Sequence, residues 1–452
     1  MNIAASLLDL LHSGLGGLAA YLAAHVLLCL LPAFFIAGAL AALMPKEAIT
    51  RYLGRSAPKW ISYPASALGG FFLAVCSCTI MPLFASIYKK GAGLGPAITF
   101  LFVGPAVNIL AISFTGVQIG LDIAIARIIL SMIFGILIGL LMAWFFRKDD
   151  AAHDEAAANN HLFDGKASIP LPVLIFFLLL LGTLLAGTLQ IGLFRTVFYE
   201  ITLPGTWAVH LQTWLDTLIP KNPALGIEGV CIHGLFIIAL LIAIALTAIK
   251  GFRDIFKGFN SWTYVTLGLI TLMLIIASFS VAVNEVDFVI GLNGRVVAEI
   301  ILLTSIWWMA ASWLSAQARQ EWLWETWRFV KQIIPLLLVG VFVASIARAL
   351  IPSIWIKTFA GRNTFWANLA GVLFGVFMYF PTLVEVPVAQ TFLSLGMHRG
   401  PLLAYLLADP ELSLQSILIT NTVIGKKKTA LYVLLVSVFS TLSGLIFGWF
   451  IR

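Results

Sequence analysis

Two cysteines stand one residue apart inside a long apolar stretch, in the segment Cys76-Ser77-Cys78-Thr79. Thiolates are soft ligands that select soft metals, and trivalent arsenic or mercury should behave in the same way. Cys76 and Cys78 are therefore candidate metal or metalloid ligands, and Ser77 and Thr79 are substrate-binding candidates beside them. The alternative is that both cysteines pack as small apolar side chains.

A second apolar stretch carries a carboxylate, Glu385, shortly after Pro381-Thr382. A charged side chain costs roughly 2.5–3.5 kcal/mol at the centre of a membrane helix, so it is a functional candidate by default. Burial favours the protonated form, which makes Glu385 a candidate for proton coupling. Pro381 and Thr382 join it as substrate-binding candidates. The alternative is that Glu385 only forms an ion pair with Arg127 or Arg348.

Both candidate groups lie in a repeat with a constant spacing of 305 residues, in which Pro82, Gly91, Gly95, Pro96 and Pro105 correspond to Pro387, Gly396, Gly400, Pro401 and Pro410. Apolar segments that are broken by Gly and Pro at matching positions of two halves indicate a transporter's binding site. The alternative is that these residues only kink ordinary membrane helices.

At the same spacing Asn108 corresponds to Ser413, and both are substrate-binding candidates. Asp409 and Glu411 stand close to Ser413, where they could also lie at the outer membrane interface.

The composition predicts a polytopic membrane protein built from helices. Of the 452 residues, 61% are hydrophobic and 10% are charged, against about 25% charged in soluble domains. The apolar runs lack the alternation of barrel strands, and a helix crosses the bilayer with roughly 20 apolar residues. We expect about ten transmembrane helices, at 18–43, 96–115, 122–146, 170–191, 224–249, 262–283, 296–315, 333–351, 401–419 and 429–451.

Two further apolar stretches, 61–88 and 365–395, are interrupted by polar residues or proline, and we expect them to be re-entrant hairpins. With this arrangement 18 of the 27 Lys and Arg residues face the cytoplasm, 7 face outward and 2 lie within spans. This distribution satisfies the positive-inside rule, with both termini outside a cell inner membrane. The two halves are then inverted copies, which supports alternating access.

The chain divides into four expected parts. Residues 1–146 form a first repeat of helix, hairpin and two helices, and 329–452 form its inverted copy. Between them, 147–169 is polar and reads as a cytoplasmic linker. Residues 170–328 are expected to hold four helices and an external loop, 192–223, in which Trp207, Leu211 and Trp214 lie on a short amphipathic segment.

The motif residues resemble the predicted-permease family that includes the trivalent organoarsenical exporters of the ArsP type; they are Val75-Cys76-Ser77-Cys78, Pro82-Leu83, Lys90-Gly91-Ala92, Gly95, Phe100-Leu101 and Pro105-Ala106-Val107-Asn108. The resemblance covers about 18–146 and 333–451, and the middle spans look like an insertion relative to shorter relatives. It implies Cys76 and Cys78 as thiol ligands. Many relatives also carry a Cys-Ser-Glu-like segment in the second half. Here residues 379–385 hold no cysteine, which counts against a three-thiol arsenic site.

These features favour a secondary active permease, not an enzyme, that exports a thiophilic metalloid, an organoarsenical or another small solute. Coupling to protons would use Glu385. No nucleotide-binding P-loop motif is present, so ATP is not the evident energy source. We expect no cofactor and no nucleic-acid partner, and we leave a homo-oligomer open. Two alternatives remain: a membrane thiol oxidoreductase that uses Cys76 and Cys78, and a passive channel for a small solute.

Overall fold

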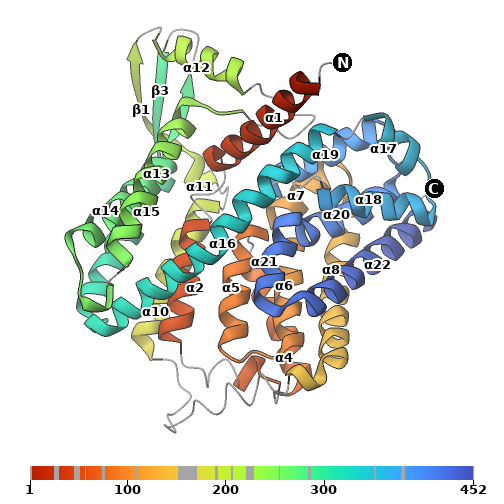
Figure 1. Cartoon of the computed structure of the whole chain (residues 1–452), viewed down its shortest axis with the longest axis horizontal. Helices are drawn as coiled ribbons and strands as arrows, with labels where there is room; N and C mark the ends of the chain where they lie inside the picture. Colours follow the sequence, from red (N-terminus) through yellow and green to blue (C-terminus); the bar gives the residue numbers. More distant parts are fainter. Residues whose placement is uncertain are drawn as a thin grey trace.

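A computed structural model describes the chain outside residues 1–2, 25–29, 45–50, 56, 74–76, 108, 151–169, 189–191, 205–206, 220–228, 254, 284–286, 351–352, 378–381 and 451–452. Almost all of the described chain is helical (Figure 1). The first part contains α1 (Ile3–Ala24), α2 (Leu31–Leu43), α4 (Lys59–Leu73), α5 (Ser77–Lys89), α6 (Leu94–Ala106), α7 (Ile109–Gln118) and α8 (Leu121–Phe145).

The middle part contains longer helices and a small sheet. Its elements are α10 (Leu171–Thr188), α11 (Gly192–Arg195), β1 (Val197–Pro204), α12 (Trp207–Leu218), α13 (Ile232–Phe252), η3 (Ile255–Lys257), α14 (Ser261–Ser278), β2 (Ser280–Val283), β3 (Asp287–Asn293) and α15 (Gly294–Ser312). The last part contains α16 (Ala316–Leu350), α17 (Ser353–Ala360), α18 (Phe365–Phe377), α19 (Thr382–Ser394), α20 (Arg399–Leu412), α21 (Leu414–Ile424) and α22 (Lys426–Phe450).

The helices of the last part follow those of the first part at the same spacing of 305 residues. Helices α5 and α19 correspond end to end, and so do α8 and α22. The tight turns also correspond, because Gly91 and Gly396 both have a left-handed backbone, with φ of 94° and 93°. A side chain with a Cβ atom is strained at such a φ, so glycine fixes both turns. The repeat in the sequence is therefore a repeat of local structure. We refer to α4–α8 as the first segment and to α18–α22 as the second segment.

The structure confirms an all-helical membrane architecture in its main features. Within the described chain, six helices are long and apolar enough to cross a membrane, or seven if the bent pair α20 and α21 counts as one span. Five further apolar helices are shorter, among them α2, α6 and α18. The expected count of ten crossings and the two re-entrant hairpins stay predictions.

One expected straight span differs from the structure. The span at 401–419 divides into α20 and α21, which are bent by 46° relative to one another. The bend occurs because Ser413 has an extended ψ of 145° and caps the N-terminus of α21, which starts a new helix. Of the span expected at 18–43, the structure describes α1 up to Ala24 and α2 from Leu31, and residues 25–29 lie outside the described chain.

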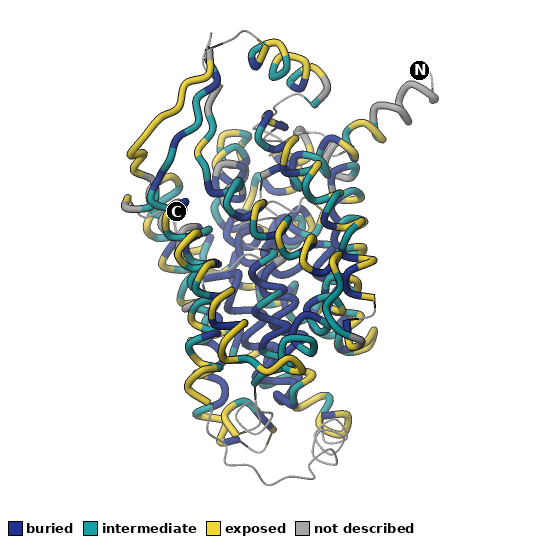
Figure 2. Tube along the Cα trace, turned by 90° about the vertical axis from the view of Figure 1, so that its left-hand side faces the viewer, coloured by how far each residue is buried: buried dark blue, intermediate teal, exposed yellow. Residues whose placement is uncertain are grey.

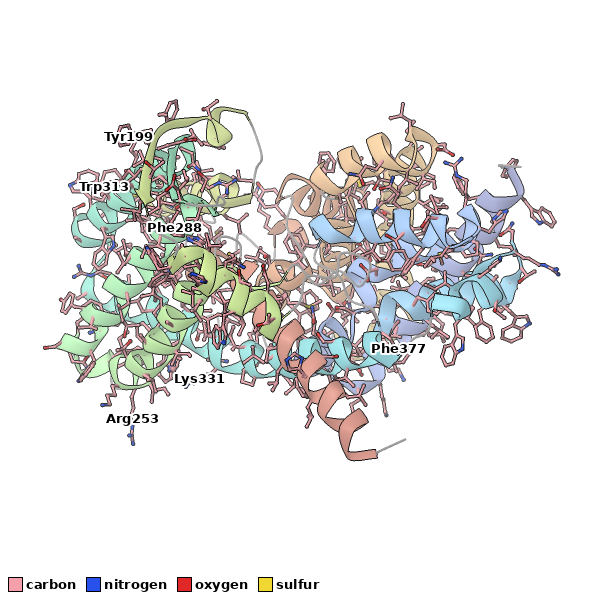
Figure 3. The ribbon with its side chains drawn as sticks, turned by 90° about the horizontal axis from the view of Figure 1, so that it is seen from above. Tyr199, Arg253, Phe288, Trp313, Lys331 and Phe377 are labelled. Carbon is pink, nitrogen blue, oxygen red and sulfur yellow. The ribbon has the colours of Figure 1, made fainter. Side chains whose placement is uncertain are left out.

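The expected external loop at 192–223 contains a strand, and its external position stays a prediction. β1 pairs antiparallel with β3, and β3 pairs antiparallel with β2, giving the order β1-β3-β2. The amphipathic segment is helix α12, and its residues Ala208 and Leu215 pack with Phe288 of β3. Figure 3 labels Phe288 on this sheet together with the exposed Tyr199. Strand pairing over about ninety residues leaves no local sequence signal.

The most deeply buried helices are α6 and α20, one from each segment. All residues of α6 and all residues of α20 from Gly400 to Leu412 are buried. They pack against each other, α6 also packs against α4 and α8, and α20 also packs against α18 and α22. Figure 2 shows the buried residues, in dark blue, gathered in the interior of the helical part. Each segment therefore presents its central helix to the other.

Glycine pairs allow this close packing, and a substitution tests it. A Cβ atom on Gly444 would lie 2.5 Å from the carbonyl oxygen of Gly400 on the neighbouring helix, whereas a Cβ atom on Gly268 meets nothing within 4 Å. We expect Gly444→Ala to lower the free energy of unfolding by about 1–3 kcal/mol, because α20 and α22 must separate. Gly268→Ala is the matched control and should not destabilise the protein. Thermal unfolding in detergent measures both, and equal melting temperatures would contradict the close approach.

Candidate functional site

The structure places the sequence-predicted residues unevenly. Cys76, Asn108 and Pro381 lie outside the described residues. Ser77 and Cys78 follow the undescribed residues 74–76 and belong by their backbone to α5, and Thr382 follows the undescribed residues 378–381 and belongs to α19. Thr79 is fully buried. The structure describes the side chains of four further residues in full, namely Arg127, Glu385, Glu411 and Tyr432.

Glu385 forms a buried ion pair with Arg127. The Nη2 atom of Arg127 lies 3.0 Å from Oε1 and 3.1 Å from Oε2 of Glu385. The exposed fraction of the two side chains is 0% and 1%. Arg127 lies on α8 and Glu385 on α19, so the pair joins the first segment to the second. The ion pair with Arg127 that the sequence allowed is therefore present, and a role of Glu385 in proton coupling stays a prediction.

Helix ends stabilise both charges of this pair. The Nε atom of Arg127 donates a hydrogen bond of 3.1 Å to the carbonyl oxygen of Ala106, the last residue of α6. Glu385 lies in the first turn of α19. A helix favours a cation at its C-terminus and an anion at its N-terminus. The guanidinium and the carboxylate therefore each meet the helix end that suits their charge.

A second buried carboxyl group lies beside the pair. The Oη atom of Tyr432 on α22 donates a hydrogen bond of 2.9 Å to Oε2 of Glu411. Glu411 is 1% exposed and interacts electrostatically with both Arg127 and Glu385. It lies in the last turn of α20, where the helix dipole disfavours an anion. We call Arg127, Glu385, Glu411 and Tyr432 the central cluster.

The central cluster occupies corresponding positions of the two segments. Adding 305 to Ala106 and Arg127 gives Glu411 and Tyr432. The hydrogen bond from Arg127 to Ala106 and that from Tyr432 to Glu411 therefore join the same two positions of the repeat. The spacing of 305 residues thus relates Glu411 and Tyr432 to the contact of Ala106 with Arg127. This spacing could have predicted both as site residues from the sequence.

Asp409 and Glu411 both lie inside the packed helix α20, and the exposed fraction of each is 1%. Their depth relative to the outer membrane interface stays a prediction. Ser413, by contrast, has a local role. Its Oγ atom lies 2.7 Å from Oγ of Ser416 and accepts a hydrogen bond from the Ser416 backbone N–H, which fixes the bend between α20 and α21.

The interrupted part of each segment packs against the other segment. Helix α5 contacts α21, and α19 contacts α7. The first contact includes the Oγ1 atom of Thr420, which lies 3.7 Å from the sulfur of Met81. Helix α5 corresponds to α19, and α7 corresponds to α21. The contact of α5 with α21 and the contact of α19 with α7 are therefore equivalent contacts of the repeat. Helices α5 and α19 thus both take part in the interface between the segments that also holds the central cluster.

The part of the chain that the structure describes contains no group of three or more His, Cys, Asp or Glu side chains able to hold a metal ion. The exposed Cys231 has a structural role, since its Sγ atom accepts a hydrogen bond of 3.4 Å from the Gly234 N–H at the start of α13. The predicted thiol site at Cys76 and Cys78 therefore remains a prediction from the sequence.

Comparisons with known proteins place this chain among membrane permeases. The family described as "Predicted permease" matches residues 13–449. The match runs through α10 to α15, which the sequence resemblance did not cover. The UPF0718 protein MJ0584 of Methanocaldococcus jannaschii is 32% identical over 453 residues, which cover all of both chains. No solved structure matches the chain. With several membrane-length helices and a match over nearly its whole length, the chain belongs to the predicted-permease family.

Proposed function

We propose that this membrane permease is a proton-coupled secondary transporter that exports a small thiophilic solute across the cell inner membrane. The observation that carries the proposal is the buried ion pair between Arg127 and Glu385, because it joins the two repeated segments beside their interruptions. Charged groups inside membrane helices are costly and commonly belong to proton relays and substrate pathways.

The charges of the central cluster support a bound proton. The central cluster holds two buried carboxyl groups and one guanidinium, and a buried carboxylate without compensation is strongly unfavourable. Glu385 has the guanidinium as its partner and a helix N-terminus beside it. Glu411 has a hydroxyl donor at Oε2, while its Oε1 atom accepts no hydrogen bond from the described residues. Neutralising Glu411 with a proton balances the cluster, so the Glu385–Glu411 carboxyl pair is the proposed proton carrier.

Alternating access supplies the transport cycle. The two segments have matching helices, and in Figure 1 α4 lies near the bottom of the molecule while its counterpart α18 lies in the upper right part. This placement supports an inverted arrangement, in which exchange of the two segments' conformations moves the opening from one side to the other. Such a movement separates α8 from α19 and so breaks the ion pair. Protonation of a carboxyl group lowers the electrostatic cost of that step.

The substrate class follows from the first interruption. Cys76 and Cys78 flank the start of α5, and a dithiol there suits trivalent arsenic, antimony or mercury compounds, as arsenic resistance by efflux would require. Ser77, Thr79, Asn108, Pro381 and Thr382 are the further residues proposed to line the solute's path.

Reconstituted vesicles test the coupling, with methylarsenite as the probe. For the wild-type protein, we expect a proton gradient to drive accumulation of methylarsenite against its own gradient. In Glu411→Gln the carboxyl group can no longer exchange a proton, so accumulation should fall to the level without a gradient while downhill exchange continues. Glu299→Gln is the matched control, since Glu299 is also 1% exposed but lies on α15, outside the cluster. Unchanged gradient-driven accumulation in Glu411→Gln would refute the proton-carrier role.

A further inference from the structure

A cavity of about 370 Å³ lies at one end of the first segment, away from the central cluster. It is enclosed by the turn before α4, the start of α6 and the end of α8. Three cationic side chains line it: Arg55, Lys59 and Arg147. One carboxylate, Asp150, also lines it, and its Oδ1 atom accepts a hydrogen bond of 2.8 Å from the N–H of Leu94 at the start of α6. The lining therefore has an excess of positive charge.

The repeat shows that helix packing does not require this cavity. In the second segment the corresponding place is filled by Asn363, whose Nδ2 atom donates a hydrogen bond of 3.0 Å to the carbonyl oxygen of Leu445. At a spacing of 305 residues, Asn363 corresponds to Pro58 and Leu445 to Leu140, which lines the cavity. The helices of the second segment thus pack around the side chain of Asn363, whereas the corresponding helices of the first segment surround the basic cavity.

Tryptophans indicate where this cavity lies relative to the membrane. Trp144 lines the cavity and is 69% exposed, and Trp60 beside Lys59 is 78% exposed. Exposed tryptophans next to basic residues are typical of the membrane–water interface, at the level of the lipid headgroups. The three cations belong to the side that the positive-inside rule assigns to the cytoplasm.

We propose that this cavity binds the phosphate headgroup of an anionic phospholipid. Basic pockets between membrane helices on the cytoplasmic side suit such headgroups, and guanidinium groups such as those of Arg55 and Arg147 match the oxygens of a phosphate. Trp144, which lines the cavity and is largely exposed, would contact the glycerol and acyl chains of the same lipid. The proposal is independent of the transported solute.

Native mass spectrometry of the delipidated full-length protein tests it, with phosphatidylglycerol and phosphatidylcholine as probes. For the wild-type protein, we expect one phosphatidylglycerol to bind in preference to phosphatidylcholine. Each neutralised cation should weaken that binding roughly fivefold, so Arg55→Gln/Lys59→Gln/Arg147→Gln should abolish the preference. The matched control is Lys250→Gln/Arg253→Gln/Lys331→Gln, in which the three replaced cations are exposed on the flank that Figure 3 labels with Arg253 and Lys331.

A second variant separates a built cavity from general charge attraction. Ala143→Leu fills the cavity from α8 and leaves all three cations in place, so it should also lose phosphatidylglycerol. This variant decides the question if the triple variant does not fold. Retention of phosphatidylglycerol by Ala143→Leu, or equal loss in the matched control, would overturn the proposal. Displacement of the lipid by an equal concentration of glycerol phosphate would assign the cavity to a soluble anion instead.

Discussion

Arg127→Met is expected to lower the free energy of unfolding by about 3–5 kcal/mol, because it leaves the buried carboxylate of Glu385 without its partner. The loss is large because the exposed fraction of both side chains is at most 1%, so water cannot replace the guanidinium. The hydrogen bond from Arg127 to the end of α6 is lost at the same time. The midpoint of unfolding in denaturant, measured on protein purified in detergent, checks this result.

The double variant Arg127→Met/Glu385→Met should recover most of that stability, since no uncompensated charge remains in the cluster from this pair. It should nevertheless transport no solute against its gradient, because the switching pair is gone. A double variant as unstable as Arg127→Met would show that the pair is not the source of the effect.

A second ion pair between the same two segments provides the matched control. Arg399 on α20 lies 2.9 Å from Asp122 on α8, but the exposed fraction of each side chain is 36%. Exposed pairs contribute about 0–1 kcal/mol. We therefore expect Arg399→Met to lower the free energy of unfolding several-fold less than Arg127→Met does. Both variants replace one arginine in the same interface.

Cys76→Ser/Cys78→Ser is expected to abolish protection of a metalloid-sensitive host against methylarsenite. Serine keeps the size of each side chain and removes the soft sulfur ligand, so binding of a thiophilic solute should be lost. Growth and efflux in whole cells, against methylarsenite, arsenite, antimonite and mercury, measure the effect and identify the substrate class. Comparable amounts of folded protein in the membrane must accompany the loss.

Cys29→Ser/Cys231→Ser is the matched control, because it replaces the other two cysteines of the chain. Cys231 caps α13 in the middle part, far along the chain from the repeated segments. We expect this variant to protect the host as well as the wild type does. Full protection by Cys76→Ser/Cys78→Ser would end the thiol-ligand hypothesis and leave a permease for a different kind of solute.

The sequence by itself determined the features that depend on local chemistry. The long apolar runs predicted membrane helices, because no other regular structure hides its backbone within a single segment. The constant spacing of 305 residues predicted a repeat, and Gly91 and Gly396 accordingly have the same left-handed backbone, which favours glycine. The interruptions predicted near Cys76 and Pro381 fall outside the described residues in part and stay predictions.

Only the tertiary structure decided which distant residues meet. Arg127 and Glu385 are 258 residues apart in the chain, and the sequence left Arg348 as an equal partner. The packing of α20 against α22 buries Glu411 and brings it to Tyr432, which is 21 residues away in the chain. The pairing of β1 with β3 and the basic cavity beside Trp144 were not predicted at all. These features depend on how helices and strands pack. The free energy of a long-range contact cannot be inferred from the residues that neighbour each partner in the sequence.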